Sequence, residues 1–471
     1  MRTGARIALG GAFAIAALGG AYLIGAPLLR DGQAGAGTAL AAQIGCADVF
    51  LMHRTVEDAE RNDVHSLAPT AMIIRLRSDP AARTVKASIP GVVTRISTFR
   101  PGFGCTLASG STAKSNLAAS VPSAASSSLP GLNATEVPLP TQLNGPAQAA
   151  VDRIFNETNA NGYPDTRGMV VVKDGRIIAE RYAPGYSAAT PMLGWSMTKS
   201  VTSALIGILV GRGRLELDAP APVPEWQKPG DPRHTITLRQ LLTMSSGLKF
   251  IEDYVAGSDS VQMLFHEPDM AAYAARQPQQ HQPGSHWSYS SGTTNILARM
   301  VRNAVGGTDA SFNNFARDAL FAPAGIRSMV IEPDQSGVPV GSSYGYATTR
   351  DWARFGLLYL HGGNVKGQQI LPKSWIDFTT TPTPAAPTKL YGAQFWLNQG
   401  PVSGRSARHY PHCPADMYLA EGFSGQFVAI VPSLNIVIVR LGWTPPDQDF
   451  AIDRHFSAIL NAISTRAKGD S

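Results

Sequence analysis

Four β-rich runs predict that the two ends of the segment 143–471, the main body of the chain, lie in one sheet. Val170–Val172 and Arg176–Tyr182 flank Asp174-Gly175, a dipeptide typical of a type I′ hairpin turn. Far downstream, Phe427–Val431 and Ile436–Leu441 form a second β-rich pair. The stretch between them, about 195–420, is mostly helical and rich in loops. This order predicts an α+β fold, with one antiparallel sheet built from both ends of the body and a helical region inserted between them.

An uncharged apolar run covers residues 7–29, between Arg6 and Arg30. As a helix it would be roughly 34 Å long, which is enough to cross a bilayer. We expect an uncleaved signal anchor, because the run exceeds the length of a signal-peptide core and basic residues precede it. The alternative is a cleaved signal peptide with its site at Ala39-Leu40-Ala41. Either reading predicts an exported protein on the periplasmic side, and the first keeps it on the inner membrane.

The exported part divides into three segments. After the anchor and its tail (1–41), residues 42–105 form a small N-terminal unit, 106–142 a Ser/Ala/Pro-rich linker, and 143–471 the main body. Cys46 and Cys105 bracket the N-terminal unit and can pair as a disulfide in an oxidising compartment. The alternative is that they are two buried thiols. Cys413 is left over and is expected to have no catalytic role.

Charge and cysteine content exclude several classes of function. The formal net charge is only +6 over 471 residues, and no Lys/Arg block occurs, which argues against a nucleic-acid partner. Three cysteines cannot form a four-cysteine zinc site. We expect no metal and no cofactor.

Short motifs for a hydrolytic nucleophile occur at several places. Ser111 and Lys114 form a Ser-x-x-Lys pair within the linker, where nothing would hold their geometry. Ser246 and Lys249 form another at a glycine that ends an apolar run. Residues 341–345 (GSSYG) fit the G-x-S-x-G pattern, but no strong strand precedes them. None of these three has the context that its chemistry requires.

Ser196 and Lys199 form a third Ser-x-x-Lys pair, at the start of a predicted helix. Positions i and i+3 share a helix face, so the amine lies beside the hydroxyl. The helix N-terminus favours negative charge that develops on the serine. A buried Lys199 would have a lowered pKa and could accept the serine proton. The alternative is a helix-capping serine beside a solvated lysine.

Three ordered segments resemble the serine β-lactamase and penicillin-binding-protein superfamily. They are residues 194–220 (GWSMTKSVTSALIGILVGRGRLELDAP), 236–248 (ITLRQLLTMSSGL) and 283–301 (PGSHWSYSSGTTNILARMV). The similarity is greatest to the class C-like branch, which includes esterases, D-aminopeptidases and 6-aminohexanoate-dimer hydrolases, and it extends over about 145–465. It implies a β-lactamase/transpeptidase-like fold and an acyl-enzyme reaction on a small ester or amide substrate.

The resemblance also implies roles for individual residues. Ser196 would be the acylated nucleophile and Lys199 its base. The second motif of the family is Tyr-x-Asn or Tyr-x-Ser, which Tyr289-Ser290-Ser291 matches. Tyr289 would shuttle protons with the lysine, and Ser291 would contact substrate with fewer hydrogen bonds than the usual asparagine. Tyr254 and Trp396 are further candidates for substrate contact.

The third motif of the family departs from its pattern here. Ala420-Glu421-Gly422 stands where Lys-Thr-Gly or His-x-Gly is usual. The backbone oxyanion hole would use the N–H groups of Ser196 and Phe423, with Gly422 beside the substrate. Without the cation that binds a carboxylate, an esterase or a hydrolase of linear amides such as 6-aminohexanoate oligomers is favoured. The alternatives are a β-lactamase or D-Ala-D-Ala peptidase, and a sensor that is acylated without turnover.

Overall fold

The computed structural model describes residues 32–66, 69–109, 139–157, 166–401, 407–445 and 449–464. The apolar run 7–29 and most of the linker lie outside these ranges. Within them, no helix combines the length and the apolar character that a membrane span requires. The predicted anchor is therefore not tested by the fold.

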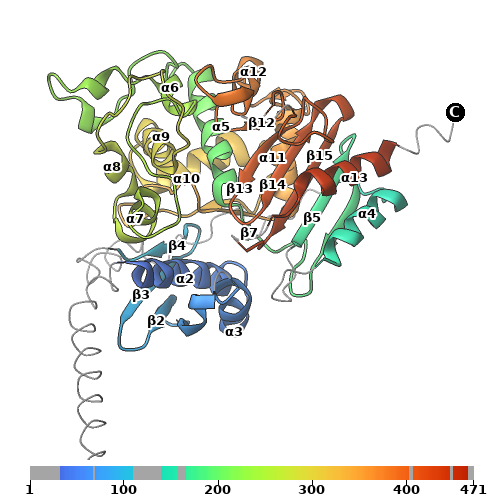
Figure 1. Cartoon of the computed structure of the whole chain (residues 1–471), viewed down its shortest axis with the longest axis horizontal. Coiled ribbons are helices and arrows are strands. Elements are labelled where there is room, and N and C mark those ends of the chain that lie inside the picture. Colours follow the sequence, from blue (N-terminus) through green and yellow to red (C-terminus); the bar gives the residue numbers. More distant parts are fainter. Residues whose placement is uncertain are drawn as a thin grey trace, which may run out of the picture.

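A six-stranded antiparallel sheet forms the centre of the main body (Figure 1). The strands from the two ends of the body are neighbours in it, because β15 pairs with β5 through contacts such as Val439 opposite Val170. The predicted α+β sheet is thus confirmed. In spatial order the strands are β12 (Trp396–Leu397), β13 (Tyr418–Gly422), β14 (Gln426–Val431), β15 (Ile436–Gly442), β5 (Thr166–Lys173) and β6 (Arg176–Tyr182).

Helices cover both faces of this sheet. Helices α4 (Gly145–Phe155) and α13 (Ile452–Ser464) pack together on one face, and α11 (Thr349–Leu360) covers the other (Figure 1). This explains why β15 reads as an almost continuous apolar run, since every one of its residues is buried. Gly356 lets α11 lie close to β15, because a Cβ there would be only 2.6 Å from Val437 Cγ1.

The helical region lies beside the sheet and is centred on α5 (Thr198–Gly211), which is buried over nearly its whole length. It contacts α9 on one side and β13 of the sheet on the other, so its N-terminus lies where the two regions meet. The remaining helices of this region are α6 (Leu238–Leu242), α7 (Asp259–His266), α8 (Met270–Ala275), α9 (Ser291–Ala304), α10 (Asp309–Ala316) and α12 (Lys373–Thr380). Short strands connect it: β7 (Met192–Leu193), β8 (Val330–Ile331), β9 (Gly345–Ala347), β10 (Asn364–Val365) and β11 (Gln368–Gln369).

The N-terminal unit is a helix packed on a small sheet, below the main body in Figure 1. Its helix α2 (Gln33–Phe50) runs through residue 42, where the sequence placed the start of the unit. Helix α2 contacts all four strands of an antiparallel sheet. The other elements are α3 (Val56–Ala59), β1 (Arg75–Asp79), β2 (Thr84–Ile89), β3 (Val93–Arg100) and β4 (Gly104–Leu107).

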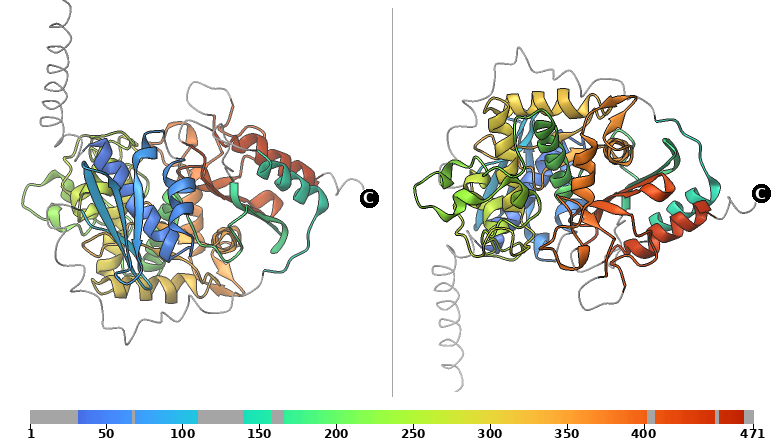
Figure 2. Two further views of the ribbon diagram at one scale, coloured as in Figure 1. Left: turned by 90° about the horizontal axis from the view of Figure 1, so that it is seen from below. Right: turned by 90° about the horizontal axis from the view of Figure 1, so that it is seen from above.

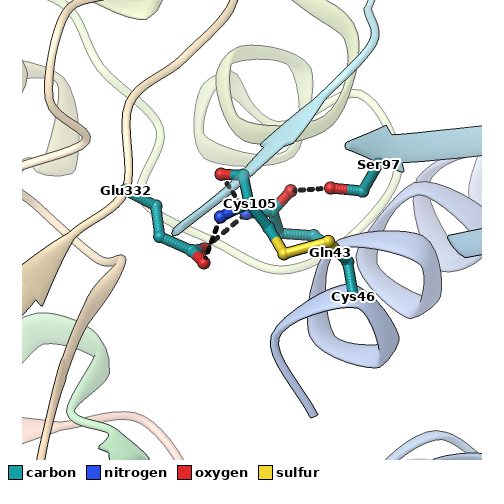
Figure 3. Close-up of a disulfide and its surroundings, with 5 residues drawn as sticks. All are labelled: Gln43, Cys46, Ser97, Cys105 and Glu332. Atoms are coloured by element: carbon teal, nitrogen blue, oxygen red, sulfur yellow. Dashed lines mark hydrogen bonds between the residues drawn. A yellow bond between two sulfur atoms is a disulfide. The ribbon is translucent and has the colours of Figure 1, made fainter. Parts of the chain in front are cut away.

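A disulfide between Cys46 and Cys105 joins α2 to β4 (Figure 3). Next to it, Glu332 of the main body accepts a hydrogen bond from the Cys105 N–H at 2.6 Å and another from Gln43 Nε2 at 2.5 Å. Gly104 permits this approach, since a Cβ there would lie 2.6 Å from Glu332 Cγ. Burial raises the pKa of Glu332 to about 8. The N-terminal unit and the main body therefore share a buried polar contact.

A second buried contact links the N-terminal unit to the sheet. Asp63 of the unit pairs with both Arg54 and Arg167, and Arg167 belongs to β5. Asp63 and Arg167 are both buried. Breaking one partner of a buried ion pair leaves an uncompensated charge, so this contact resists separation of the two parts.

Candidate active site

Ser196 lies on a tight turn immediately before helix α5. The turn is the 3-10 element η4 (Trp195–Met197), and α5 begins one residue after it. Trp195 has φ of +47°, a conformation that costs a bulky residue free energy and persists only where the surroundings enforce it. Its ring packs against those of Tyr344, Phe423 and Trp443. The strained turn fixes the position of the serine.

Lys199 is buried beside Ser196, with 1% of its surface exposed. Its Nζ donates to Ser196 Oγ at 2.9 Å, to Ser291 Oγ at 3.0 Å and to the Ser342 carbonyl at 3.0 Å. Burial lowers the pKa of Lys199 to about 8, although the charge of Glu252 opposes the change. The alternative of a solvated lysine is therefore wrong, and the amine is suited to accept a proton near neutral pH.

Tyr289 presents the face of its ring to this amine, since Lys199 Nζ is 4.8 Å from the ring centroid. The ring also packs against Trp396 and Tyr391. Burial raises the pKa of Tyr289 well above its usual value, the charges of Tyr391 and Glu252 add to the rise, and a hydrogen bond with Ser196 opposes it. The phenol is therefore protonated at rest and can donate a proton.

Ser291 is the first residue of α9, and both its N–H and its hydroxyl contact Glu252. The Ser291 N–H donates to Glu252 Oε2 at 2.7 Å, and Ser291 Oγ donates to Glu252 Oε1 at 2.6 Å. The carboxylate thus lies one hydroxyl away from Lys199. No local motif marks Glu252, because its partners lie far away in the sequence.

The third-motif segment lies directly against the turn that carries Ser196. A Cβ on Gly422 would lie only 2.2 Å from the Gly194 carbonyl oxygen, so only glycine fits this contact. Phe423 follows Gly422 at the end of β13, and its ring meets that of Trp195 edge to face, with centroids 5.7 Å apart. These contacts bring the backbones of Phe423 and Ser196 close together.

A cleft of about 320 Å³ opens at Ser196. It gathers the remaining predicted residues, since Tyr289, Tyr254, Trp396, Gly422 and Phe423 all line it. Two acidic side chains also line it, Glu421 and Asp449, and the described lining residues include no Lys or Arg. Burial raises the pKa of Glu421 to about 7, and a hydrogen bond with Tyr410 limits the rise.

The other candidates from the sequence lie elsewhere. Ser343 of the G-x-S-x-G segment is buried, and the segment instead supplies the Ser342 carbonyl to Lys199. Cys413 is buried, and desolvation raises the pKa of its thiol to about 12, which is the opposite of activation. In the ranges that the structure describes, no group of three or more His, Cys, Asp or Glu side chains is placed to hold a metal ion.

This fold, with a serine and a buried lysine at the start of a helix against the sheet, defines a serine hydrolase of the β-lactamase type. The family model described as Beta-lactamase matches residues 151–462, and the chain therefore belongs to the beta-lactamase family. The match covers the main body and leaves out the N-terminal unit.

Individual relatives carry hydrolase and esterase names. A 6-aminohexanoate-dimer hydrolase from Paenarthrobacter ureafaciens is 25% identical over 326 residues, which cover 63% of this chain and 76% of that protein. Esterase EstB from Burkholderia gladioli is 32% identical over 163 residues, or 31% of this chain and 40% of that one. The solved structure of a penicillin-binding protein homologue from Caulobacter crescentus shares the fold, with a TM-score of 0.52 at 19% identity. The superposed region covers 69% of this chain and 98% of the chain of that structure.

Proposed function

We propose that this protein hydrolyses an ester or linear amide through an acyl-enzyme on Ser196. The observation that carries the proposal is the contact of 2.9 Å between the buried Lys199 Nζ and the Oγ of Ser196, which lines the cleft. Lys199 takes the hydroxyl proton as Ser196 Oγ bonds to the substrate carbonyl carbon. The oxyanion that forms is stabilised by the N–H groups of Ser196 and Phe423, usually the largest single contribution in such chemistry.

Collapse of this intermediate needs a proton on the leaving group. The protonated phenol of Tyr289 gives its proton to the departing oxygen or nitrogen and regains one from Lys199. The bond from the carbonyl carbon to the leaving group breaks, and the acyl group stays on Ser196 Oγ. Water then attacks the ester and releases the acid by the same steps in reverse.

The charge of the cleft supports an ester or linear amide substrate. β-Lactams and D-Ala-D-Ala peptides carry a carboxylate, which the lysine or histidine of the usual third motif binds. Here Glu421 occupies that motif and Asp449 lines the same cleft. An anionic substrate would find no lysine or histidine in this motif, and because the pKa of Glu421 is about 7 it would meet repulsion from Glu421 as the pH rises above 7. A neutral substrate, or one with an amino group such as a 6-aminohexanoate oligomer, would not.

We propose an exported location for the enzyme, with residues 7–29 as its anchor in the inner membrane. The length of that run and the basic residues before it support an anchor. The disulfide supports an oxidising compartment. Extraction of isolated membranes at alkaline pH tests the anchor, since release of the full-length chain into the supernatant contradicts it.

Ser196→Ala tests the mechanism, with Ser246→Ala as the matched control from another Ser-x-x-Lys pair. We expect Ser196→Ala to lose nitrophenyl-ester turnover and fluorophosphonate labelling while the control keeps both. Full activity in Ser196→Ala refutes the proposal. A screen of esters, 6-aminohexanoate amides and β-lactams then ranks the substrates. A stoichiometric burst with no steady state would instead indicate an acylated sensor.

A further inference from the structure

Glu252 lies next to the reacting groups, and the steps described above do not use it. We propose that Glu252 is a positioning residue which, through Ser291, aims the lone pair of neutral Lys199 at the hydroxyl of Ser196. The inference rests on the proposed function, in which Lys199 accepts the proton of Ser196. It concerns how the amine is oriented, and the carboxylate itself touches neither substrate nor nucleophile.

The donors and acceptors around Ser291 Oγ allow only one arrangement of hydrogen bonds. An ionised carboxylate can only accept hydrogen bonds, so the single hydroxyl hydrogen of Ser291 goes to Glu252 Oε1 at 2.6 Å. Ser291 Oγ therefore presents only a lone pair to Lys199 Nζ, at 3.0 Å. Lys199 Nζ must therefore be the donor in its contact with Ser291 Oγ.

Counting the hydrogens of Lys199 in the same way determines the direction of its lone pair. The Ser342 carbonyl also only accepts, at 3.0 Å, and so takes a second hydrogen from Nζ. A neutral amine has two hydrogens and one lone pair. The protonated amine donates its third hydrogen to Ser196 Oγ at 2.9 Å, and when that proton is lost the lone pair points at the same oxygen. A free Ser291 hydroxyl would be able to donate to that lone pair instead, and Lys199 would then be unable to accept from Ser196.

The carboxylate also acts through its charge. The titratable side chains that face the amine are Glu252 and Tyr289, and the charge of Glu252 opposes the lowering of the Lys199 pKa by burial. Burial raises the pKa values of Tyr254, Tyr289 and Tyr391, and the charge of Glu252 adds to each rise. Removal of the charge is therefore expected to lower the pKa of Lys199 further and to move the acid limb of the pH–rate profile to lower pH.

A merely structural role for Glu252 is the competing explanation, because its second oxygen accepts the Ser291 N–H at the start of α9. Glu252→Gln keeps the size of the side chain but replaces one of its two accepting oxygens by an NH2 group. This donor would then face a donor of Ser291, either its N–H or its hydroxyl. Ser291→Ala removes the hydroxyl and leaves the N–H contact with Glu252 in place. Asp269→Asn is the matched control, since Asp269 caps α8 through the Ala272 N–H, away from the site.

The experiment measures kcat, KM and the pH profile of nitrophenyl-ester hydrolysis in the full chain, with melting temperature as the folding check. We expect Glu252→Gln and Ser291→Ala each to lower kcat at least tenfold with KM within about twofold. The acid limb should move to lower pH only in Glu252→Gln. The double variant should lie within about threefold of the slower single variant, because both changes break one relay. Asp269→Asn should match wild type in kcat and in pH profile.

Three results overturn the inference: kcat of Glu252→Gln within twofold of wild type, an acid limb that does not move, or effects that multiply in the double variant. A Glu252→Gln protein that melts earlier but keeps its kcat and profile has lost only a helix cap. Failure of the proposed function is distinguishable, since Ser196→Ala would then retain activity. Wild type labelled at Ser196 together with an unaffected Glu252→Gln refutes the relay alone.

Discussion

Replacing Gly422 with alanine is expected to disable the proposed oxyanion hole without unfolding the protein. The new Cβ would lie 2.2 Å from the Gly194 carbonyl oxygen, whereas ordinary contacts of this kind begin near 3.4 Å. The end of β13 would have to retreat by about 1 Å from the turn that carries Ser196. Gly422 has no positive φ, so alanine adds no strain to the backbone conformation, and the other tight contact of the new Cβ is with Gln426 Cβ at 3.1 Å.

The displacement moves the Phe423 N–H away from the Ser196 N–H, so the two donors no longer converge on one oxygen. A misplacement of 1 Å in a reacting geometry costs roughly 10²-fold in rate, and loss of one oxyanion donor costs about 10²–10³-fold in kcat. We therefore expect kcat of Gly422→Ala to fall about 100-fold, which corresponds to about 3 kcal/mol of transition-state stabilisation. KM should change little, because the donors act mainly after attack.

The assay is the acylation burst with a nitrophenyl ester, followed by steady-state turnover and a thermal melt of each variant. Gly145→Ala is the matched control, because nothing lies within 4 Å of a Cβ built at Gly145. The control should keep the rate of wild type. A folded Gly422→Ala protein with kcat within threefold of wild type would refute the placement of the oxyanion hole between Ser196 and Phe423.

Three further predictions concern pH and stability. Because Lys199 must be neutral and its pKa is lowered to about 8, kcat/KM should rise about tenfold from pH 7 to pH 9; a flat initial-rate profile there would contradict the assigned base. Replacing Cys46 and Cys105 by alanine opens a loop of 59 residues and should cost about 4 kcal/mol in urea unfolding by the chain-entropy model; a loss below about 1 kcal/mol would argue against it. The pKa of Glu332 is raised from 4.5 to about 8 in the folded protein, so its contribution to stability is full below about pH 4.5 and is lost as the pH rises through 8. The melting temperature of wild type should therefore fall more steeply from pH 6 to pH 9 than that of Glu332→Gln. Parallel melting curves of the two proteins against pH would contradict this prediction.

The parts of the site that the sequence predicts are those set by local geometry. Ser196 and Lys199 lie three residues apart at a helix start, and that spacing alone places the amine beside the hydroxyl. The sheet was predictable for a similar reason, since its strands are runs of β-forming residues that are buried on both faces. Resemblance to the family added Tyr289 and the segment around Gly422, which no periodicity marks.

The contacts that the sequence did not predict join segments far apart in the chain. The Ser342 carbonyl lies 143 residues from Lys199, and Glu252 lies 39 residues before Ser291. A backbone carbonyl has no sequence signature, and a single glutamate resembles any surface acid until its partner is known. The start of α2 at Gln33 was missed for a different reason: this Ala- and Gly-rich helix is buried on most sides and so shows no amphipathic pattern.

The contact of Glu332 with the disulfide-bonded unit bears on how modular this enzyme is. The Glu332 N–H donates to the Tyr344 carbonyl, and the Glu332 carbonyl accepts from Val340, so Glu332 is tied to both sides of the loop that offers Ser342 to Lys199. A shortened chain that began after the linker would leave this carboxyl without the Cys105 and Gln43 donors. Engineering that trims the protein to the part its relatives share would thus remove a support two residues from the lysine's carbonyl partner. The segment outside the family match is, in this sense, part of the catalytic scaffold.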